Sequence, residues 1–343
     1  MSGWQLLPRS AFAEYTADWD RLNQHLYQAH PLLDSRFVAM LVEHFAKSRT
    51  YLAIYQATGK PVSNLLLLEP GKPGLWQTFL PSQAQIAPVL CEDPTKLSQL
   101  PSALPGFTLA VDILCQDSLF SFSKATPLHL DSFAHATTIN ITLSESFIDY
   151  WEQRSRKLQQ NIRRYFNRLT KNGSSYKLNI ITTANELALA LQRYGELESQ
   201  SWKGAAGTAI HKDNIQGRFY SDVLQNFACS QQAEIVELYF DEKLVASRIN
   251  VLNKQMLITL KTSYDENLAE YAPGRLLLYL LIEREFKLQR VAQIEFYTNA
   301  TSDQISWSSG QRSIEHLMLY RSRKVQWLTN NFRRVKAKFS KSI

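Results

Sequence analysis

The chain carries one arrangement of residues twice, and this repeat constrains its fold more than any other feature. The segment S-R-F-V-A-M-L-V-E-H-F-A-K-S (35–48) aligns with G-R-F-Y-S-D-V-L-Q-N-F-A-C-S (217–230) at an offset of 182 residues, with five identities in 14 positions. Each segment leads into a strand–turn–strand pattern with a lysine in the turn, Lys60 and Lys243. Solenoid repeats have periods of about 20–50 residues, so a period this long predicts two copies of one domain.

The second copy predicts its elements clearly. Thr142 or Ser146 is expected to cap a long helix that runs to Gly173, and a crossover helix is expected to open at Pro273. The expected strands are residues 176–183, 234–241, 243–252, 255–264, 293–297 and 316–320, and the other expected helices are residues 185–202 and 215–230.

This order of elements predicts an α+β fold with a mixed α/β sheet. Strands joined by short turns pair antiparallel, whereas strands on either side of a crossover helix pair parallel. The first copy is shorter and rich in proline after Glu69, and it shows no counterpart of the helix start at Pro273. The first domain is therefore expected to be a degenerate copy.

Positive charge is concentrated in two segments. The chain has a formal net charge of +7, and residues 154–171 hold seven basic side chains without an acid. Residues 319–343 hold eight more, again without an acid, so the remaining chain sums to −8. A general nucleic-acid binder spreads its basic residues over one face, and two local sites fit this distribution better.

The first basic segment has the pattern of a docked helix. At 100° per residue its apolar side chains form one stripe, made of Leu158, Ile162, Tyr165 and Leu169. One flank of the stripe carries four cations, Lys157, Arg164, Arg168 and Lys171. The back of the helix carries two more, Arg156 and Arg163. The flank is predicted to bind the diphosphate of a nucleotide sugar, a lipid-linked sugar or coenzyme A, and a solvated charged face is the alternative.

The second basic segment, residues 323–343, is expected to form an amphipathic helix. Its apolar positions repeat at spacings of three and four residues: Val325, Leu328, Phe332, Val335 and Phe339. Such a helix suits an anionic membrane surface, at about 1 kcal/mol for each well-placed basic residue. Packing on the first domain and a frayed tail are the alternatives.

Several classes of protein are not expected. No apolar run reaches the ~18 residues of a membrane span and the N-terminus lacks a signal-peptide pattern, so a cytoplasmic protein is expected, peripheral at the inner face of the membrane at most. The three cysteines are widely separated, and the seven histidines show no metal-ligand spacing. No Walker motif and no G-x-S-x-G is present, so neither a metal cofactor nor a serine hydrolase is expected.

The run L-K-T-S-Y-D-E-N-L-A-E-Y-A-P-G-R-L-L-L (260–278) has the pattern of a ligand site. A strand ends near Tyr264, and Pro273 sets the first turn of the next helix. Gly274 leaves the backbone open to a ligand, while the free amides and the dipole of the first turn attract an anion. Arg275 adds positive charge. A well-started buried helix is the alternative interpretation.

These features together resemble the acyltransferase domain of cellulose and exopolysaccharide biosynthesis proteins of the CelD type. The matching features are the basic helix R-K-L-Q-Q-N-I-R-R, S-W-K at 201–203, Lys261 with Tyr264-Asp265, and A-P-G at 272–274. That family has the GNAT fold and is related to the Fem peptidyltransferases of peptidoglycan assembly. The resemblance covers roughly residues 145–322, and the first half resembles the companion region of such proteins at H-P-L-L-D-S-R-F-V (30–38).

The resemblance implies tandem GNAT-like domains, with a degenerate domain at 1–142, an acyltransferase domain at 143–322 and the basic helix at 323–343. It also implies that acetyl-CoA or another acyl-CoA binds at the helix start, through Pro273, Gly274, Arg275 and Leu276. Two features depart from the family. The usual glycine-rich loop is reduced to Gly274, and no lysine follows Glu295 where many relatives have a Tyr-Lys pair.

Acyl transfer needs a base near the acceptor, a donor site and a group that stabilises the oxyanion. Asp265 and Glu295 are the candidate bases, and Tyr264 or Tyr297 is the candidate acid for a departing thiolate. A salt bridge or a half-buried phenol is the alternative for each. The candidate substrate-binding residues are Trp202, Arg248 and Lys261, with Lys157, Arg164 and Arg168 of the basic helix.

The charges in the strand-like runs, Arg248 and Lys261, either pair with carboxylates such as Glu237 or point into a cleft. The resemblance thus implies an acyltransferase that moves an acyl group from coenzyme A to an amine or hydroxyl of a sugar, nucleotide-sugar or lipid-linked precursor in cell-envelope or exopolysaccharide biosynthesis. A Fem-like ligase that takes aminoacyl groups from charged tRNA is one alternative, and it predicts RNA binding that falls steeply with salt. A non-catalytic binding or scaffold protein of the same pathway is the other.

Overall fold

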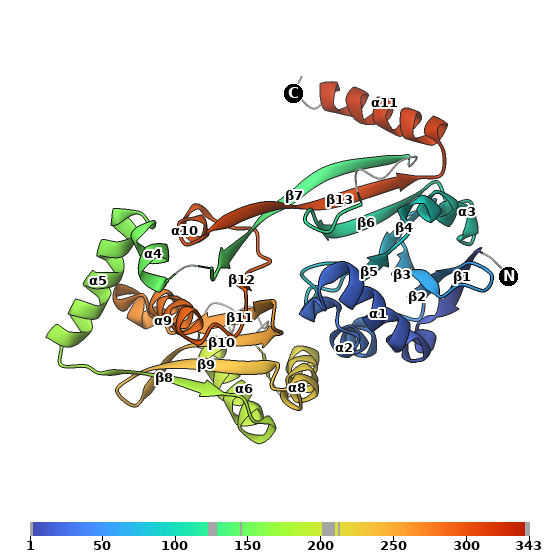
Figure 1. Ribbon diagram of the computed structural model, residues 1–343. Helices are drawn as coiled ribbons and strands as arrows, with labels where there is room; N and C mark the ends of the chain where they lie inside the picture. The colour runs from blue at the N-terminus through green and yellow to red at the C-terminus, as the bar shows by residue number, and fades with distance from the viewer. Residues whose placement is uncertain (1–2, 123–128, 145, 201–209, 212, 340–343) are drawn as a thin grey trace. The chain divides into compact units, whose positions relative to one another are not determined.

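The computed structural model describes residues 3–122, 129–144, 146–200, 210–211 and 213–339, with side chains through Arg333 (Figure 1). The chain divides into two compact units, Met1–Thr137 with Arg312–Ile343, and Thr138–Gln311. The first unit therefore takes residues from both ends of the chain. The domain limits expected at 142/143 and 322/323 stay a prediction.

The second unit holds the mixed sheet that the sequence predicts. Its strand order is β8-β9-β10-β11-β12-β7, in which β8 to β11 pair antiparallel, β11 and β12 pair parallel, and β12 and β7 pair antiparallel. The strands are β8 (Tyr176–Ile181), β9 (Ala233–Phe240), β10 (Lys243–Leu252), β11 (Met256–Tyr264), β12 (Gln293–Glu295) and the end of β7 (Leu130–Thr142), of which residues 138–142 belong to this unit. The meander and the later parallel pair are confirmed.

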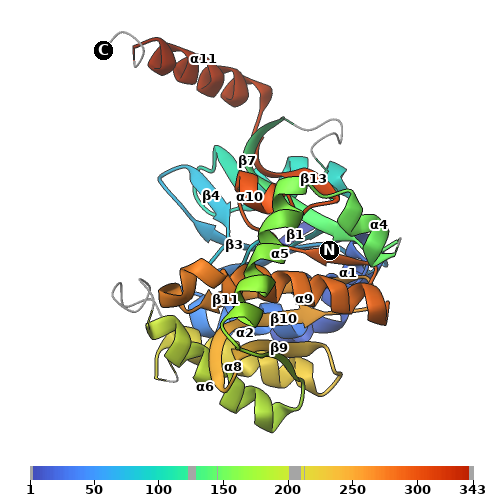
Figure 2. The same ribbon diagram turned by 90° about the vertical axis from the view of Figure 1, so that its left-hand side faces the viewer.

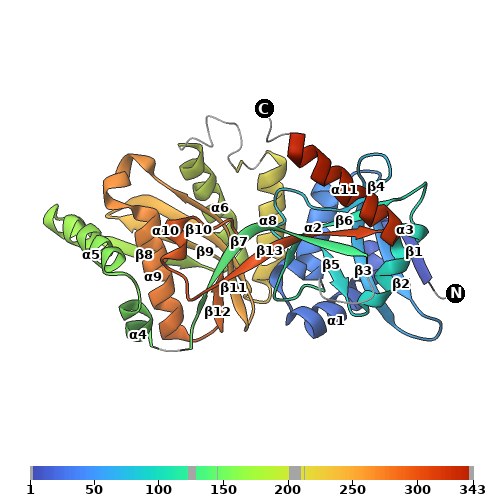
Figure 3. The ribbon, with the colours of Figure 1, turned by 90° about the horizontal axis from the view of Figure 1, so that it is seen from above.

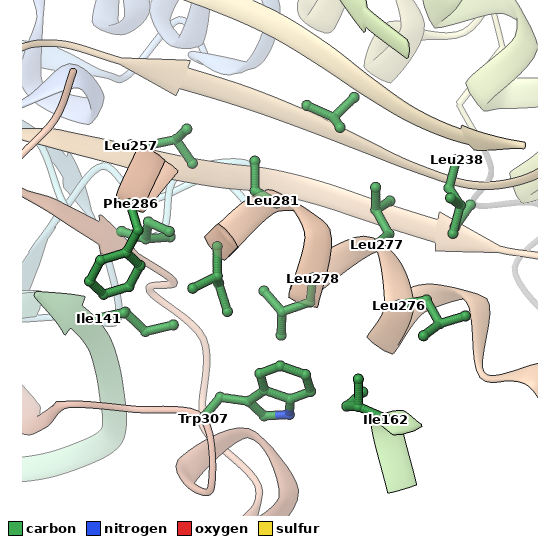
Figure 4. Close-up of a cluster of buried hydrophobic side chains, with 14 of the residues drawn as sticks. Ile141, Ile162, Leu238, Leu257, Leu276, Leu277, Leu278, Leu281, Phe286 and Trp307 are labelled. Carbon is green, nitrogen blue, oxygen red and sulfur yellow. The ribbon is translucent and has the colours of Figure 1, made fainter. Parts of the chain in front are cut away.

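Helices cover both faces of this sheet. Helices α6 (Ala184–Ser199) and α8 (Ile215–Ala228) lie side by side on one face (Figures 1 and 3). Helix α9 (Pro273–Leu288) lies on the other face and begins at the predicted proline. Figure 4 shows Leu277 and Leu281 of α9 pointing toward the strands that carry Leu238 and Leu257. Burying these leucines on the sheet holds α9 in place.

The basic helix is shorter than predicted. The segment forms two helices, α4 (Phe147–Glu152) and α5 (Arg156–Lys171), where one helix running to Gly173 was expected. Ser146 caps α4 by accepting from the amide of Asp149 at 3.1 Å, as predicted. Ser155 accepts from the amide of Leu158 at 3.2 Å, and this second cap starts α5 anew. The predicted apolar stripe of α5 is buried, and α5 lies beside α9 (Figure 2).

The first unit repeats the order of elements of the second. Its strand order is β1-β2-β3-β4-β6-β13, followed by residues 130–137 of β7, with β4 and β6 parallel and β5 paired with β3. The strands are β1 (Gly3–Pro8), β2 (Tyr51–Gln56), β3 (Val62–Pro70), β4 (Leu75–Thr78), β5 (Val89–Cys91), β6 (Ala110–Asp117) and β13 (Gly310–Tyr320). The helices are η1 (Arg9–Tyr15), α1 (Thr16–Tyr27), η2 (Pro31–Leu33), α2 (Ser35–Phe45), η3 (Pro94–Gln99), α3 (Leu100–Ala103) and α11 (Arg323–Phe339). The aligned segments of the sequence repeat fall on α2 and α8, which precede β2–β3 and β9–β10.

Two details were not predicted. The first unit does have a counterpart of the Pro273 helix, because η3 begins at Pro94 and continues into the four-residue α3 between the parallel strands β4 and β6. The sixth strand of each sheet is also exchanged in chain order. β7 follows the first copy but pairs with β12, and β13 follows the second copy but pairs with β6.

Candidate active site

The parallel strands β11 and β12 share only a short pairing in the described structure. Met256–Ile258 pair with Gln293–Glu295, whereas β11 continues to Tyr264. The register between β10 and β11 shifts after Ile249, which leaves Leu260 as an extra residue on β11. Such a bulge bends a strand and strengthens its twist, and bulges are frequent beside active sites. The second half of β11 is therefore the place where a ligand can meet the sheet.

The start of α9 follows this half of β11. Ala272 has the left-handed φ of 47°, Pro273 is the first helical residue, and no side chain caps the helix. A Cβ added to Gly274 would lie 3.0 Å from Cδ1 of Tyr264, so the glycine lets the tyrosine ring rest against the helix start. The first turn contains no acidic residue. The positive end of the helix dipole is thus left for an anion.

The charge of Arg275 is partly offset. Its Nη2 lies 2.8 Å from Oδ1 of Asp303 in α10 (Ser302–Ile305), and its Nη1 donates to the hydroxyl of Tyr165 in α5 at 3.3 Å. Arg275 therefore joins three helices and does not stand as a free cation. Leu276, which was predicted to bind the cofactor, has its side chain 1% exposed in the core, so only its backbone belongs to the helix start.

The two candidate bases lie in different surroundings. Asp265 is buried, accepts from the amide of Asn267 at 2.9 Å as the cap of η4 (Glu266–Tyr271), and pairs with Lys243 at 2.7 Å. Burial raises the pKa of this carboxyl. The hydrogen bond and charge of Lys243 and the hydrogen bonds of Asn267 outweigh burial, so the pKa of Asp265 is below its ordinary value. Glu295 is fully buried on β12, opposite Ile258 and Asn140.

The two candidate acids differ in access. The side chain of Tyr264 is 44% exposed beside Gly274, whereas Tyr297 is buried and has a left-handed φ of 45°. A positive φ is unusual for a bulky residue and is found mostly where the surrounding structure enforces it. The catalytic roles of all four residues stay predictions.

Lys261 belongs to a buried polar cluster on the side of the sheet covered by α6. Its Nζ lies 3.2 Å from Oε1 of Glu198 and 5.6 Å from the ring centre of Tyr220. Glu198 also accepts from the amide of Ile210 at 2.8 Å. Sequence reasoning missed Glu198, although a lysine inside a strand signals that a buried acid is needed to pair it. Burial, followed by the charge of Glu198, raises the pKa of Tyr194 well above its usual value.

Arg248 is the most unusual charge in the second unit. It is 8% exposed in β10, opposite Val236 and Thr262. Among the described residues no hydrogen bond or ion pair reaches its guanidinium, and its buried Nε has no partner. Burial lowers its pKa to about 10. Glu237, which sequence reasoning offered as its partner, binds Arg193 instead at 2.8 Å.

The predicted ligand residues of α5 are only partly brought to the α9 start. Arg168 pairs with Glu270 at 3.5 Å and lies over the ring of Tyr271, both in η4 just before α9. Lys157 and Arg164 are exposed, and Lys157 lies about 16 Å from Arg168 along the helix axis. Trp202 falls outside the described residues.

A pocket of 760 Å³ lies between α4, α5 and α9 and was not predicted. The two cations that line it are Arg156 and Arg163, which sequence reasoning placed on the back of α5. Four aromatic side chains, Phe147, Trp151, Phe166 and Tyr279, and two carboxylates, Glu152 and Glu283, also line it. The sequence signal was the seven-residue spacing of the two arginines, which puts them on one side of a helix.

One group of possible metal ligands lies in the first unit. Cys115, His135 and His316 bring one ligand atom each within 4.8 Å of one another. The backbone amide of Cys115 donates to Nδ1 of His316 at 3.0 Å, so a neutral His316 carries its proton on Nε2. Neither nitrogen of that ring then offers a free lone pair to a metal. We assign no metal to this group, and the expected absence of a metal cofactor stays a prediction.

Comparisons with known proteins agree with this geometry. Residues 156–303 match the family described as acetyltransferase (GNAT) domain. No curated protein matches the chain in sequence. The structure of FemX is similar with a TM-score of 0.57 at 8% identity, over 89% of this chain and 96% of that chain.

Two further solved structures are similar. A conserved protein of unknown function from Bacteroides thetaiotaomicron has a TM-score of 0.56 at 13% identity, over 93% of this chain and 100% of that chain. L-PGS from Bacillus licheniformis has a TM-score of 0.50 at 14% identity, over 84% of this chain and 92% of that chain. These likenesses concern the fold alone.

The fold is thus a tandem GNAT-like fold with a mixed α/β sheet, in which the matched segment lies within the second unit. GNAT domains generally take their acyl group from acyl-CoA. The second unit is a GNAT-type acyltransferase domain.

Proposed function

We propose that the chain transfers an acetyl or other acyl group from acyl-CoA to an amine or hydroxyl of a sugar, nucleotide-sugar or lipid-linked precursor. The pathway we propose is cell-envelope or exopolysaccharide biosynthesis, as the resemblance to CelD-type proteins implies. The observation that carries the proposal is the start of α9, whose first turn has no capping side chain. This start lies inside the segment that matches the GNAT domain.

The α9 start fits the pyrophosphate of coenzyme A. Helix amides and the helix dipole favour an anion at this end, and Gly274 lets it approach the backbone. Arg168 and Arg275 add positive charge nearby, although Glu270 and Asp303 offset part of it. The bound thioester would supply an activated acyl carbon.

In the proposed reaction, the acceptor O–H or N–H gives its proton to a base and the acceptor atom attacks the thioester carbon. The C–S bond then breaks, and the thiolate takes a proton from an acid. We favour Glu295 over Asp265 as the base, because the lowered pKa of Asp265 makes it a weak one. We favour Tyr264 as the acid, because its side chain is exposed and rests against Gly274.

A double variant tests these roles. Glu295→Gln with Tyr264→Phe is expected to lower kcat at least 100-fold while the KM for acyl-CoA changes little. Asp265→Asn serves as the comparison, since it removes the charge that pairs with Lys243 without removing the proposed base. Equal activity of the double variant and the unaltered protein would end the assignment.

We also propose that α11 brings the protein to the inner face of the cytoplasmic membrane. Trp327, Leu328 and Phe332 are 60–72% exposed on this helix, among several cations. No helix of the described residues is long and apolar enough to cross a bilayer. In a flotation experiment with vesicles that contain anionic lipid, the unaltered protein should float with the vesicles. The Leu328→Glu, Phe332→Glu variant should stay at the bottom of the gradient. Equal flotation of both proteins would exclude this role for α11.

Calorimetry with coenzyme A, acetyl-CoA and charged tRNA tests the donor. We expect coenzyme binding that Gly274→Glu lowers more than 100-fold, because the new side chain meets Tyr264 and places a carboxylate at the helix start. Ser102→Glu, on the exposed side of α3 in the first unit, is the matched control and should bind normally. Absence of coenzyme binding would exclude the acyl-CoA donor.

The Fem-like ligase is the second candidate, favoured by the likeness to FemX over most of both chains. In that case charged tRNA binds and coenzyme A does not, and raising the salt from 50 to 200 mM should weaken binding by roughly 10³-fold or more. If neither ligand binds, the non-catalytic alternative replaces both.

A further inference from the structure

The pocket between α4, α5 and α9 has the composition of a binding site. Its volume of 760 Å³ falls within the range of about 300–1,000 Å³ that small-molecule sites occupy. Its lining combines rings, cations, amides and two carboxylates within one cavity. The residues that carry the argument are Trp151, Arg156, Arg163, Phe166, Tyr279 and Glu283.

The aromatic part of the pocket is a connected group of rings. The rings of Trp151 and Tyr279 lie 4.9 Å apart edge to face, and Phe166 contacts Tyr279 at 5.6 Å. Phe147 stacks on Trp151 at 6.1 Å with 14° between the planes. Rings packed against one another in this way are held rigid, and a rigid aromatic surface suits the flat faces of a sugar or a base.

The polar part of the pocket comes mainly from one side of α5. Arg156 and Arg163 are seven residues apart, which is two helical turns or about 10 Å along the axis. Gln159 and Gln160 lie between them on the pocket wall. Both arginines line the pocket with exposed side chains, and in the described structure neither has an ion pair or a hydrogen bond. Unpaired guanidinium groups bind phosphate well, because they match two of its oxygens at once.

The opposite wall supplies an acid. Glu283 lies one turn after Tyr279 on α9, and burial raises the pKa of its carboxyl, with Lys287 acting in the other direction. Glu152 lines the same pocket from α4. Carboxylates accept hydrogen bonds from hydroxyl groups. A sugar ring carries such hydroxyl groups, whereas an ionised phosphate does not, so this wall suits the sugar.

We propose that this pocket binds a sugar diphosphate, with the diphosphate on Arg156 and Arg163 and the sugar between the aromatic rings and Glu283. The inference rests on the proposed function, since it makes the pocket the binding place of the acceptor. It moves phosphate recognition from the flank of α5 that carries Arg164 to the side that carries Arg163. The diphosphate can come from a nucleotide sugar or from a prenyl-linked sugar.

Calorimetry on the full chain tests the proposal with a uridine diphosphate sugar, a short-chain prenyl diphosphate sugar, the free sugar and inorganic pyrophosphate. The diphosphate sugars should bind, and the better of the two identifies the source. Arg156→Gln with Arg163→Gln should weaken binding at least 10-fold. Lys177→Gln with Lys254→Gln changes two exposed cations of the second unit that do not line the pocket, and should leave binding unchanged. Equal weakening in both variants would reduce the effect to overall charge and overturn the proposal.

The two sites are separable by experiment. Gly274→Glu should abolish coenzyme binding and leave diphosphate-sugar binding intact, whereas the double arginine variant should do the reverse. Competition of coenzyme A for the diphosphate sugar would show that the pocket belongs to the donor and overturn its role as an acceptor site. Failure of every diphosphate sugar to bind at millimolar concentration would overturn the inference, even if the coenzyme binds.

Discussion

The two units follow the same order of elements but start their crossover helices differently. In the first unit, η3 begins at Pro94, and the side chain of Asp93 accepts from the amide of Thr95 at 3.1 Å. In the second unit, α9 begins at Pro273 after Ala272, which offers no side-chain acceptor. The carboxylate of Asp93 thus occupies the amide end of η3. The amide end of α9 has no side-chain acceptor and is left for a ligand. Of two related copies, only the second keeps a helix start that suits an anion.

The hairpins β2–β3 and β9–β10 also differ, because one position is apolar in the first unit and charged in the second. Counted from the bulge of each hairpin, Leu66 on β3 holds the place that Arg248 holds on β10. Leu66 is fully buried in an apolar core cluster, whereas Arg248 brings a charge into the sheet. At this position the first unit has a well-packed apolar side chain. The second unit has a buried charge there, and such departures from good packing are expected at functional sites.

Placing each of these two residues in the other position should change the free energy of unfolding more than any other variant proposed below. Leu66→Arg is expected to cost about 4 kcal/mol or more in the free energy of unfolding, because it buries an unpaired charge. Arg248→Leu should stabilise the protein by about 1–3 kcal/mol and lower its activity. Urea denaturation of both variants measures the two changes. A loss of stability in Arg248→Leu would mean that the guanidinium has a stabilising partner.

Acid should destabilise the first unit through His30. Burial lowers the pKa of His30 to about 3, from an ordinary value near 6.5, so the unfolded chain binds a proton that the folded chain refuses. Stability present above pH 6.5 is therefore lost as the pH falls toward 3, at about 1.4 kcal/mol per pH unit and roughly 5 kcal/mol in all.

Thermal denaturation between pH 7 and 3.5 measures this loss. His30→Asn keeps an acceptor for the amide of Leu32 but does not titrate in this range, so its stability should fall less steeply. His211→Asn changes an exposed histidine of the second unit and should follow the unaltered protein. Parallel curves for His30→Asn and the unaltered protein would contradict the prediction.

The smallest effect is expected at the capped helix start. Asp93→Ala should cost about 1 kcal/mol in stability, because the amide of Thr95 loses its acceptor. Coenzyme affinity should not change, since the proposed donor site lies in the other unit. Chemical denaturation and calorimetry on the same variant check both statements. A change in coenzyme affinity would contradict the prediction that coenzyme A binds at the start of α9 and not at the start of η3.

The fold could be predicted from local patterns to a large extent. The repeat, the meander of the second copy and the helix at Pro273 each follow from spacing and turn residues, and all three are present. The break between α4 and α5 was missed, because Ser155 competes as a second cap inside an otherwise continuous helical pattern. The short helix at Pro94 was missed because it has too few apolar residues to show a period.

The candidate site was less predictable, because its partners are distant in sequence. Lys261 finds Glu198 and Arg275 finds Asp303 only after the strands and helices have packed. The burial of Arg248, for which the described residues show no hydrogen bond or ion pair, also depends on tertiary contacts that no local pattern encodes. Residue type and position along an element were predictable, whereas the pairing of charges was not.

The exchange of β7 and β13 sets an order in which the protein can be completed during synthesis. The second unit, residues 138–311, has all its strands once β12 has left the ribosome. The first unit starts earlier but lacks its last strand until residues 312–320 emerge, although 110–117 have long been made. Until then the edge of β6 stays open to pairing with other chains, so a nascent chain is exposed to aggregation there. Truncation after residue 311 should accordingly leave the first unit insoluble while the second unit has its full set of strands.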